Sequence, residues 1–89
     1  MPLLIVAVEL AFQYESNIFS MSLRIASFNV NSIKMRLPKV INWLGHTKTD
    51  VLLMQETKTI DENFPKNDFL NKGFNIVSSG QKSYNGVAI

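Results

Sequence analysis

The sequence predicts an α/β fold built on a strand–helix–strand unit, and three observations support this. The continuous apolar run Val51–Met54 is typical of a strand buried on both faces, because it shows no polar alternation. Leu23–Val30 is a second strand candidate, apolar or small on both faces after its second residue. Between them, four residues have the i, i+3, i+4, i+7 spacing of an apolar helix face: Leu37, Val40, Ile41 and Leu44.

Length and composition indicate one small globular domain. The chain has 89 residues, of which 46% are hydrophobic and 18% charged, a balance unlike that of disordered segments. It has no cysteine, which excludes disulfides and thiolate zinc sites and fits a reducing compartment. From Met21 onward nine basic residues face five acidic ones, a net charge of +4. This excess suits a polyanionic partner such as nucleic acid. We expect a cytoplasmic protein, associated with the nucleoid if the source is bacterial.

The first twenty residues differ in composition from the rest. They contain no Lys or Arg, and their apolar stretch is shorter than the ~20 residues that a membrane span requires. A signal peptide would begin with a positively charged region, which is missing here, and we expect no membrane association. We therefore predict an appended segment over residues 1–20, either a strand or a poorly ordered arm. The main domain is predicted over residues 21–89.

The elements that follow Leu23–Val30 can be placed in order. Residues 31–36 are predicted to form a polar, basic turn, and a helix is expected to begin near Pro38, which suits a first turn. Gly45 is a stop signal for that helix. Strand, helix and strand at this spacing predict a right-handed parallel crossover. Parallel pairing brings Asn29 and Glu56, at the ends of the two strands, to the same edge of the sheet.

The last third of the chain predicts smaller elements. Residues 59–63 read as a loop, and a short helix is expected over 65–72, ended by Gly73. Residues 74–78 predict a third strand, 80–85 a polar turn, and a fourth strand begins at Gly86. The sequence stops within that apolar run, so we expect a truncated domain.

Glu56 is the main candidate for a functional side chain, and two interpretations remain open. A carboxylate at the end of a buried strand is costly to desolvate unless a cation or a donor meets it. Open α/β sheets also bind their ligands at this edge. Glu56 is then a metal-binding carboxylate of a phosphodiesterase site. The alternative is a surface residue paired with Lys58. Asn29, likewise, is either part of such a site or a strand-end cap.

Three stretches together resemble the exodeoxyribonuclease III family of abasic-site endonucleases, within the endonuclease/exonuclease/phosphatase superfamily. Residues 27–33 resemble the opening strand and turn of that family, 53–58 its metal-ligand motif, and 80–89 its next loop and strand. The resemblance runs from Leu23 to Ile89. It implies a partial, truncated α/β sandwich, the N-terminal portion of a fold with two sheets. Since later segments contribute much of the second sheet, an exposed sheet face is expected.

The resemblance also implies roles for individual residues. Glu56 matches the glutamate that binds the catalytic Mg²⁺, for which Mn²⁺ can substitute, and Asn29 matches the asparagine beside it. Both would be catalytic and metal-binding residues. Four further positions match residues that lie against the DNA: Asn31, Lys34, Lys58 and Tyr84.

Two functions follow from these observations. The first is that of the N-terminal part of a Mg²⁺-dependent DNA-repair phosphodiesterase, which hydrolyses the backbone of double-stranded DNA at abasic sites or 3′ ends. The second is that of a non-catalytic remnant, or of one half of a split enzyme that binds DNA weakly or pairs with a separately encoded C-terminal part. The tyrosine, aspartates and histidine that complete the family's site belong to later segments, so the second function fits the chain taken alone.

Overall fold

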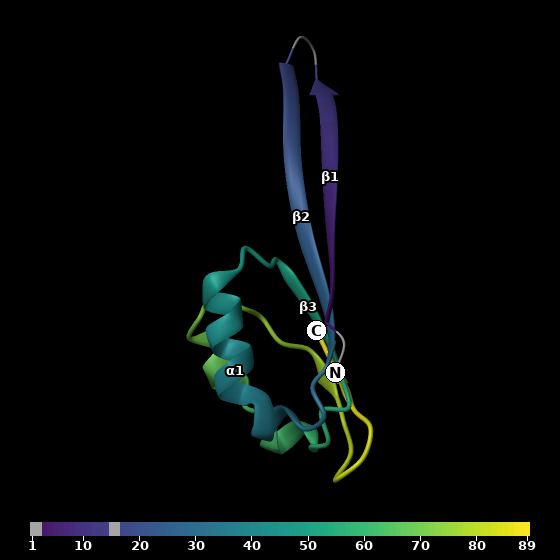
Figure 1. Ribbon diagram of the computed structural model, residues 1–89, viewed down its shortest axis with the longest axis vertical. Helices are drawn as coiled ribbons and strands as arrows, with labels where there is room; N and C mark the ends of the chain where they lie inside the picture. The colour runs from purple at the N-terminus through teal and green to yellow at the C-terminus, as the bar shows by residue number, and fades with distance from the viewer. Residues whose placement is uncertain (1–2, 15–16) are drawn as a thin grey trace.

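The computed structural model describes residues 3–14 and 17–89, and it describes side chains from residue 23 onward (Figure 1). A five-stranded sheet and two helices make up the fold. The elements in chain order are β1 (Leu3–Tyr14), β2 (Asn17–Asn29), α1 (Ile33–His46), β3 (Val51–Gln55), the 3-10 helix η1 (Asp61–Asn63), α2 (Lys66–Leu70), β4 (Ser78–Ser79) and β5 (Val87–Ala88). No helix in the described part of the chain is both long and apolar enough to cross a membrane.

The sheet has the strand order β1-β2-β3-β5-β4. β2 and β3 are parallel, in a register that runs from Ile25↔Val51 to Asn29↔Gln55, and α1 connects them. The other pairs are antiparallel. The predicted parallel crossover and the predicted α/β class are therefore confirmed.

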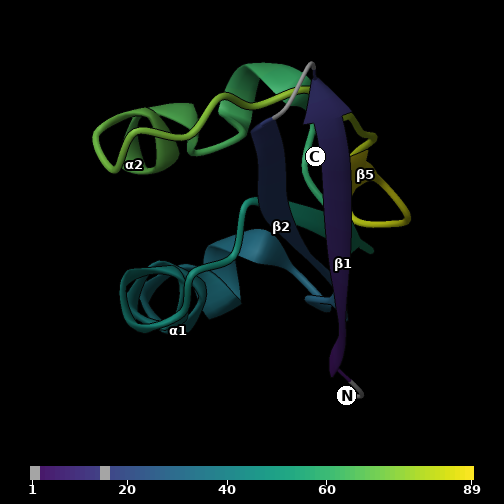
Figure 2. The same ribbon diagram turned by 90° about the horizontal axis from the view of Figure 1, so that it is seen from above.

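Both helices lie on one face of the sheet, as the view from above shows (Figure 2). On β3 the residues alternate between buried and half-buried, and Leu52 and Met54 are the buried ones. The rings of Phe64 and Phe69 pack beside them with centroids 5.9 Å apart. The side chains of the core are Ala26, Val30, Ile33, Val40, Leu44, Leu52, Met54, Phe64, Phe69 and Ala88.

Within residues 3–14 and 17–89, no helix covers the opposite face of the sheet. Val51 and Leu53 of β3 are only half-buried. Val77, Val87 and Ile89, at and near the short strands β4 and β5, are more than half exposed. Figure 2 shows neither of the two helices on this side. This is the exposed apolar sheet face that the family resemblance implies.

Helix α1 begins earlier than predicted, at Ile33, and the predicted turn over 31–36 is wrong beyond Ser32. The Ser32 side chain accepts a hydrogen bond from the Met35 N–H at 3.4 Å and so caps the helix. Ile33 is fully buried, which extends the apolar face by one turn. Pro38 therefore lies inside the helix, and the carbonyl of the exposed Lys34 lacks its usual helical partner.

The remaining predicted elements are partly correct. The predicted strand over 74–78 is reduced to β4, preceded by a pair of backbone hydrogen bonds between Val77 and Ile89 at 2.9 and 2.8 Å. The N-terminal segment forms a strand, β1, which pairs with β2 from Leu3↔Phe28 to Tyr14↔Asn17. Because β2 continues through residue 21, the predicted domain boundary falls within a strand, and it stays a prediction.

Backbone hydrogen bonds hold residues 55–58, the end of β3 and the turn that follows, between two other loops. On one side, three carbonyls accept bonds from the β2–α1 loop: Gln55 from the Val30 N–H (3.0 Å), Glu56 from the Ser32 N–H (2.9 Å) and Thr57 from the Ile33 N–H (3.1 Å). On the other side, two N–H groups donate to the loop before β5: Thr57 to the Gly86 carbonyl (3.2 Å) and Lys58 to the Asn85 carbonyl (2.8 Å). We call residues 55–58 the clamped segment.

The clamped segment contains two residues in the left-handed region, Glu56 (φ 54°) and Lys58 (φ 56°). Each such residue costs on the order of 1 kcal/mol or more, so it persists only where its surroundings enforce it. The hydrogen bonds on both sides supply that enforcement. Thr57, between the two, is 1% exposed, and its side chain lies against Gly86.

We expect Phe69→Ala to destabilise the fold strongly. Phe69 is 1% exposed, and truncating a buried Phe to Ala typically costs about 3–5 kcal/mol. The matched control is Leu70→Ala on the same helix, where the side chain is 49% exposed and we expect less than about 1 kcal/mol of change. The free energies of unfolding from urea titrations test this. Equal values for the two variants would contradict the packing described here.

We expect Gly86→Ala to loosen the clamped segment. A Cβ at this position would lie 2.2 Å from Thr57 Oγ1, and the backbone has φ +95°. The loss should be about 1–3 kcal/mol. The control is Gly45→Ala inside α1, where a Cβ would meet nothing within 4 Å. That substitution should stabilise the protein by up to about 1 kcal/mol. Urea unfolding followed by the fluorescence of Trp43, the single tryptophan, measures both effects, which must have opposite signs.

Candidate functional site

Asn29 and Glu56 meet at the carboxyl ends of two adjacent parallel strands. Asn29 is the last residue of β2 and pairs with Gln55, so Glu56 follows one residue beyond that pair. The Asn29 side chain donates a hydrogen bond through Nδ2 to Oε2 of Glu56. The two side chains that the sequence placed at one edge of the sheet are therefore in direct contact.

The amide group of Asn29 has a defined orientation. Its oxygen accepts a hydrogen bond from the Asn31 N–H at 3.1 Å, so its nitrogen faces Glu56. The bond to Asn31 is also the local contact expected of an Asn at a strand end. In this arrangement Asn29 orients the carboxylate. An amide oxygen has two lone pairs, so Oδ1 can accept the N–H and still bind a cation, and direct ligation by Asn29 stays a prediction.

Lys58 connects the carboxylate to Asn31. Its ammonium donates to Oδ1 of Asn31 at 2.5 Å and lies 3.7 Å from Oε1 of Glu56. The ion pair between Glu56 and Lys58, which the interpretation of Glu56 as a surface residue predicts, is thus present. Both side chains are partly exposed, Lys58 to 31% and Glu56 to 43%, and exposed pairs contribute little to stability. The pair therefore leaves Glu56 accessible to a cation from solvent.

The donor set at this edge is made of hard oxygen ligands. It has one carboxylate, Glu56, and two amide oxygens in the same hydrogen-bonded cluster: Oδ1 of Asn29, which accepts from the Asn31 N–H, and Oδ1 of Asn31, which accepts from Lys58. Within residues 3–14 and 17–89, no three His, Cys, Asp or Glu side chains gather as a closed metal site would require. Mg²⁺ usually binds one or two carboxylates and keeps its other positions for water and substrate phosphates. The residues present fit that kind of open site.

The other two predicted DNA-contacting residues lie around this centre. Lys34 is exposed in the first turn of α1, and Tyr84 is 69% exposed in the turn between β4 and β5. No hydrogen bond or ion pair within the described side chains joins either of them to Glu56. Their contact with DNA stays a prediction.

Sequence reasoning assigned no role to several residues that support the site. Nε2 of Gln55 donates to Ser27 Oγ at 3.1 Å and so ties β3 to β2 beside Asn29. The backbone of Thr57, between Glu56 and Lys58, bonds to Ile33 on one side and to Gly86 on the other. Both residues, Gln55 and Thr57, belong to the polar run that follows the apolar residues 51–54. That run is the sequence signal that could have identified them. Lys82, in the loop before β5, was also unassigned.

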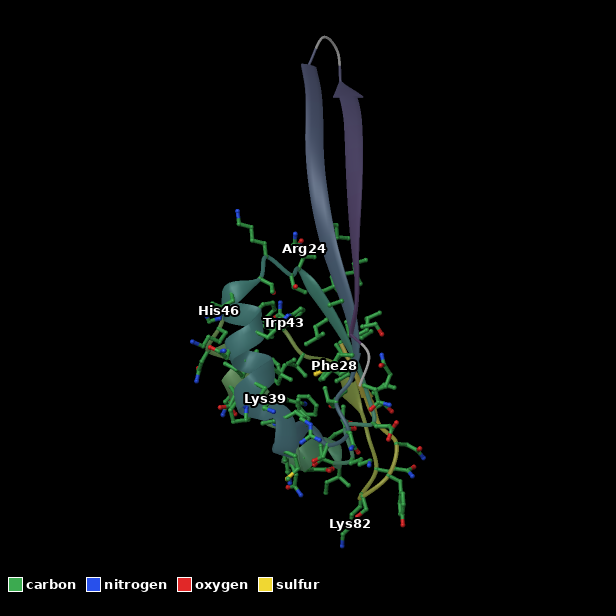
Figure 3. All side chains as sticks on the ribbon, viewed as in Figure 1. Arg24, Phe28, Lys39, Trp43, His46 and Lys82 are labelled. Atoms are coloured by element: carbon green, nitrogen blue, oxygen red, sulfur yellow. The ribbon has the colours of Figure 1, made fainter. Side chains whose placement is uncertain are left out.

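His46 lies away from this centre. It is the last residue of α1, and its ring nitrogen Nδ1 is 2.7 Å from the Asn42 carbonyl. Figure 3 shows His46 in the upper part of α1, far from Lys82, which lies at the lower tip of the molecule.

Comparisons with known proteins agree with the geometry. Residues 26–89 match the model of the endonuclease/exonuclease/phosphatase family. Exodeoxyribonuclease III from Haemophilus influenzae is 33% identical over 67 residues, which cover 75% of this chain and 25% of that protein.

Solved structures show the same similarity. An AP endonuclease from Archaeoglobus fulgidus superimposes with a TM-score of 0.73 and 55% identity, over 74% of this chain and 26% of that one. The 3′-5′ exonuclease NExo from Neisseria meningitidis gives a TM-score of 0.70 and 45% identity, over 72% and 25% of the two chains. A structure of the 3′ phosphatase NExo from Neisseria, bound to a product DNA hairpin, gives the same values.

The chain thus spans about a quarter of the length of the relatives that it matches. The matched part contains β3, the clamped segment and the end of β2, from Ala26 to Asn29. The strand–helix–strand unit, the polar edge and the family match all lead to one conclusion: this chain belongs to the endonuclease/exonuclease/phosphatase family.

Proposed function

We propose that this chain is the metal- and phosphate-binding N-terminal part of a Mg²⁺-dependent DNA phosphodiesterase that acts at abasic sites and 3′ ends. The observation that carries this proposal is the contact between Asn29 and Glu56 at the edge of the sheet, with Lys58 beside them. The relatives, which are an AP endonuclease, a 3′-5′ exonuclease and a 3′ phosphatase bound to DNA, support DNA as the substrate.

Mg²⁺, when bound, supplies positive charge that stabilises a phosphodiester and its leaving oxygen during hydrolysis. The residues of this chain hold and orient the groups around it. Glu56 provides the carboxylate, and the Asn29 amide fixes its direction. Lys58, held by Asn31, places an ammonium where a phosphate oxygen can approach. Electrostatic stabilisation of this kind requires donors that are fixed in advance, and the clamped segment fixes them.

A second candidate is a non-catalytic or split form, and one observation favours it. Hydrolysis needs a group that activates the attacking water. Among the described side chains, Lys58 is the one titratable group that contacts Glu56, and His46 is at the other end of α1. A chain with these residues alone would bind a cation and DNA weakly and would need a C-terminal part for the reaction.

Replacing Glu56 should abolish the metal site without disturbing the fold. We expect Glu56→Gln to weaken Mg²⁺ binding at least about tenfold, because the substitution removes the negative charge at nearly constant shape. Calorimetric titration with Mg²⁺, or electron paramagnetic resonance with Mn²⁺, measures the affinity. The control is Glu62→Gln in η1, an exposed residue outside the site. Equal affinities for the Glu56→Gln and Glu62→Gln variants would refute a metal site at Glu56.

Incision of an abasic-site duplex by the purified chain then separates the two candidates. Cleavage that needs Mg²⁺ and disappears in Glu56→Gln would assign the full phosphodiesterase activity to this chain. Intact Mg²⁺ binding without cleavage would assign the second candidate.

A further inference from the structure

The β1–β2 hairpin extends well beyond the rest of the sheet. β3 pairs with residues 25–29 of β2, whereas β1 pairs with β2 as far as Tyr14↔Asn17. Residues 7–14 and 17–24 therefore form a two-stranded ribbon, which rises above the helices in Figure 1. We call it the ribbon. A two-stranded ribbon alone is at best marginally stable in water, so pairing with a further strand would stabilise it.

β1 has an open outer edge along its whole length. It is the first strand in the order β1-β2-β3-β5-β4, so no strand among the described residues pairs with its outer side. Its register with β2 skips no residue, and β1 therefore contains no bulge. Its twelve residues, Leu3–Tyr14, include no Pro, Lys or Arg, and Glu9 is the one charged residue. Natural edge strands are usually protected by such residues, by bulges or by being short. This edge has none of these protections and is suited to pairing with another strand.

The sequence of β1 favours a second copy of this chain as the partner. Alternate positions of a strand share a face, and the even-numbered positions from Leu4 to Tyr14 are all apolar or aromatic. Two identical antiparallel strands are related by a twofold axis normal to the sheet, which keeps each face on its own side. Apolar positions of one copy then lie opposite apolar positions of the other. No Lys or Arg precedes Arg24, which argues against nucleic acid or an anionic membrane as the partner.

We propose that β1 pairs with β1 of a second copy of this chain, antiparallel, and that the two hairpins form one continuous sheet. The twofold axis requires one residue to lie opposite its own counterpart. Glu9 is unsuited to that position, because two carboxylates would face each other directly. The longest register that avoids this places Val8 opposite Val8 of the second copy. The pairing then extends from Leu3 to Gln13 of each β1.

The charges of the two copies are complementary in this register. Glu9 lies opposite Ala7 of the second copy, and Ala7 pairs with Arg24 within its own hairpin. Residues directly opposite each other share a face, so Glu9 and Arg24 of the second copy are on the same face, with a small alanine between them. Their backbones are two strand spacings apart, about 10 Å, which the long arginine side chain can bridge. Arg24 forms no ion pair among the described side chains of its own chain.

The pairing also leaves both candidate sites accessible. β2 runs along the hairpin toward Asn29, so the edge that carries Glu56 lies at the end of the molecule away from the ribbon (Figure 1). The antiparallel arrangement turns the two copies in opposite directions. Their Glu56 edges therefore point away from each other, at the two ends of the dimer.

Single cysteines test the register, because the chain has no cysteine of its own. Opposite residues of antiparallel strands have Cα atoms about 4.5–5.5 Å apart, a separation that a disulfide spans. We expect Val8→Cys to form a disulfide-linked dimer under mild oxidation, seen on a non-reducing gel. The matched control is Leu10→Cys, on the same face of the same strand. The two cysteines of that variant would be offset by four residues, about 14 Å, and should stay reduced.

The mass of the full chain tests the dimer itself. Sedimentation equilibrium in EDTA and without DNA should give about twice the 10.1 kDa of one chain. We expect Val8→Lys to be monomeric, because it places two ammonium groups opposite each other at the axis. The control Ser20→Lys adds the same charge to β2, outside the contact between the β1 strands, and should remain dimeric. The urea transition of Trp43 verifies that both variants are folded.

Three results would overturn the proposal. They are a monomeric wild type, a dimer whose Val8→Cys variant does not cross-link, and equal cross-linking of Val8→Cys and Leu10→Cys, which would indicate association without a fixed register. None of these measurements involves Mg²⁺ or DNA, so the proposed function can stand or fail separately.

Discussion

The parallel pairing of β2 with β3 determines where the polar side chains of this protein lie. Both strands run toward the same edge of the sheet because a helix, α1, returns the chain to its starting side. The register Asn29↔Gln55 leaves Glu56 one step beyond the end of β2, within reach of the Asn29 amide. A shift of one residue would turn the side chains of β3 to the opposite faces and would remove Met54 from the core. Core packing and site geometry therefore specify the same register.

Conformational strain is concentrated at that edge. All six non-glycine residues with positive φ among the described residues belong to the three loops that meet there: Asn31, Ser32, Glu56, Lys58, Ser83 and Asn85. Strained backbone persists only where its surroundings enforce it. Here the two sets of backbone hydrogen bonds to the clamped segment enforce it. These conformations lower the stability of the fold, and they fix the positions of the Glu56 carboxylate and of the lysines at 58 and 82. That use of strain is typical of a binding or catalytic site rather than of a structural turn.

The sequence was sufficient to predict the parts that depend on hydrophobic pattern. The buried β3, the apolar face of α1 and the shared edge for Asn29 and Glu56 follow from runs and spacings in the chain. The predicted start of α1 was wrong because Pro38 is a strong local signal that outweighed the local cap at Ser32. The burial of Ile33, by contrast, depends on tertiary contacts. The orientation of the Asn29 amide toward Glu56 involves residues far apart in the chain, which periodicity does not detect.

The antiparallel hairpin has a practical consequence for work with this protein. β1 runs against β2, so Leu3 lies opposite Phe28, the residue just before Asn29. Figure 1 shows that β1 starts at the lower end of the hairpin, on the side of the loops. A purification tag rich in histidine, fused there, would attach imidazole ligands close to Glu56, and histidine binds divalent metals readily. A tag joined after Ile89 would share this problem, because Ala88 pairs with Met54, two residues before Glu56. Metal titrations therefore call for protein from which the tag has been removed.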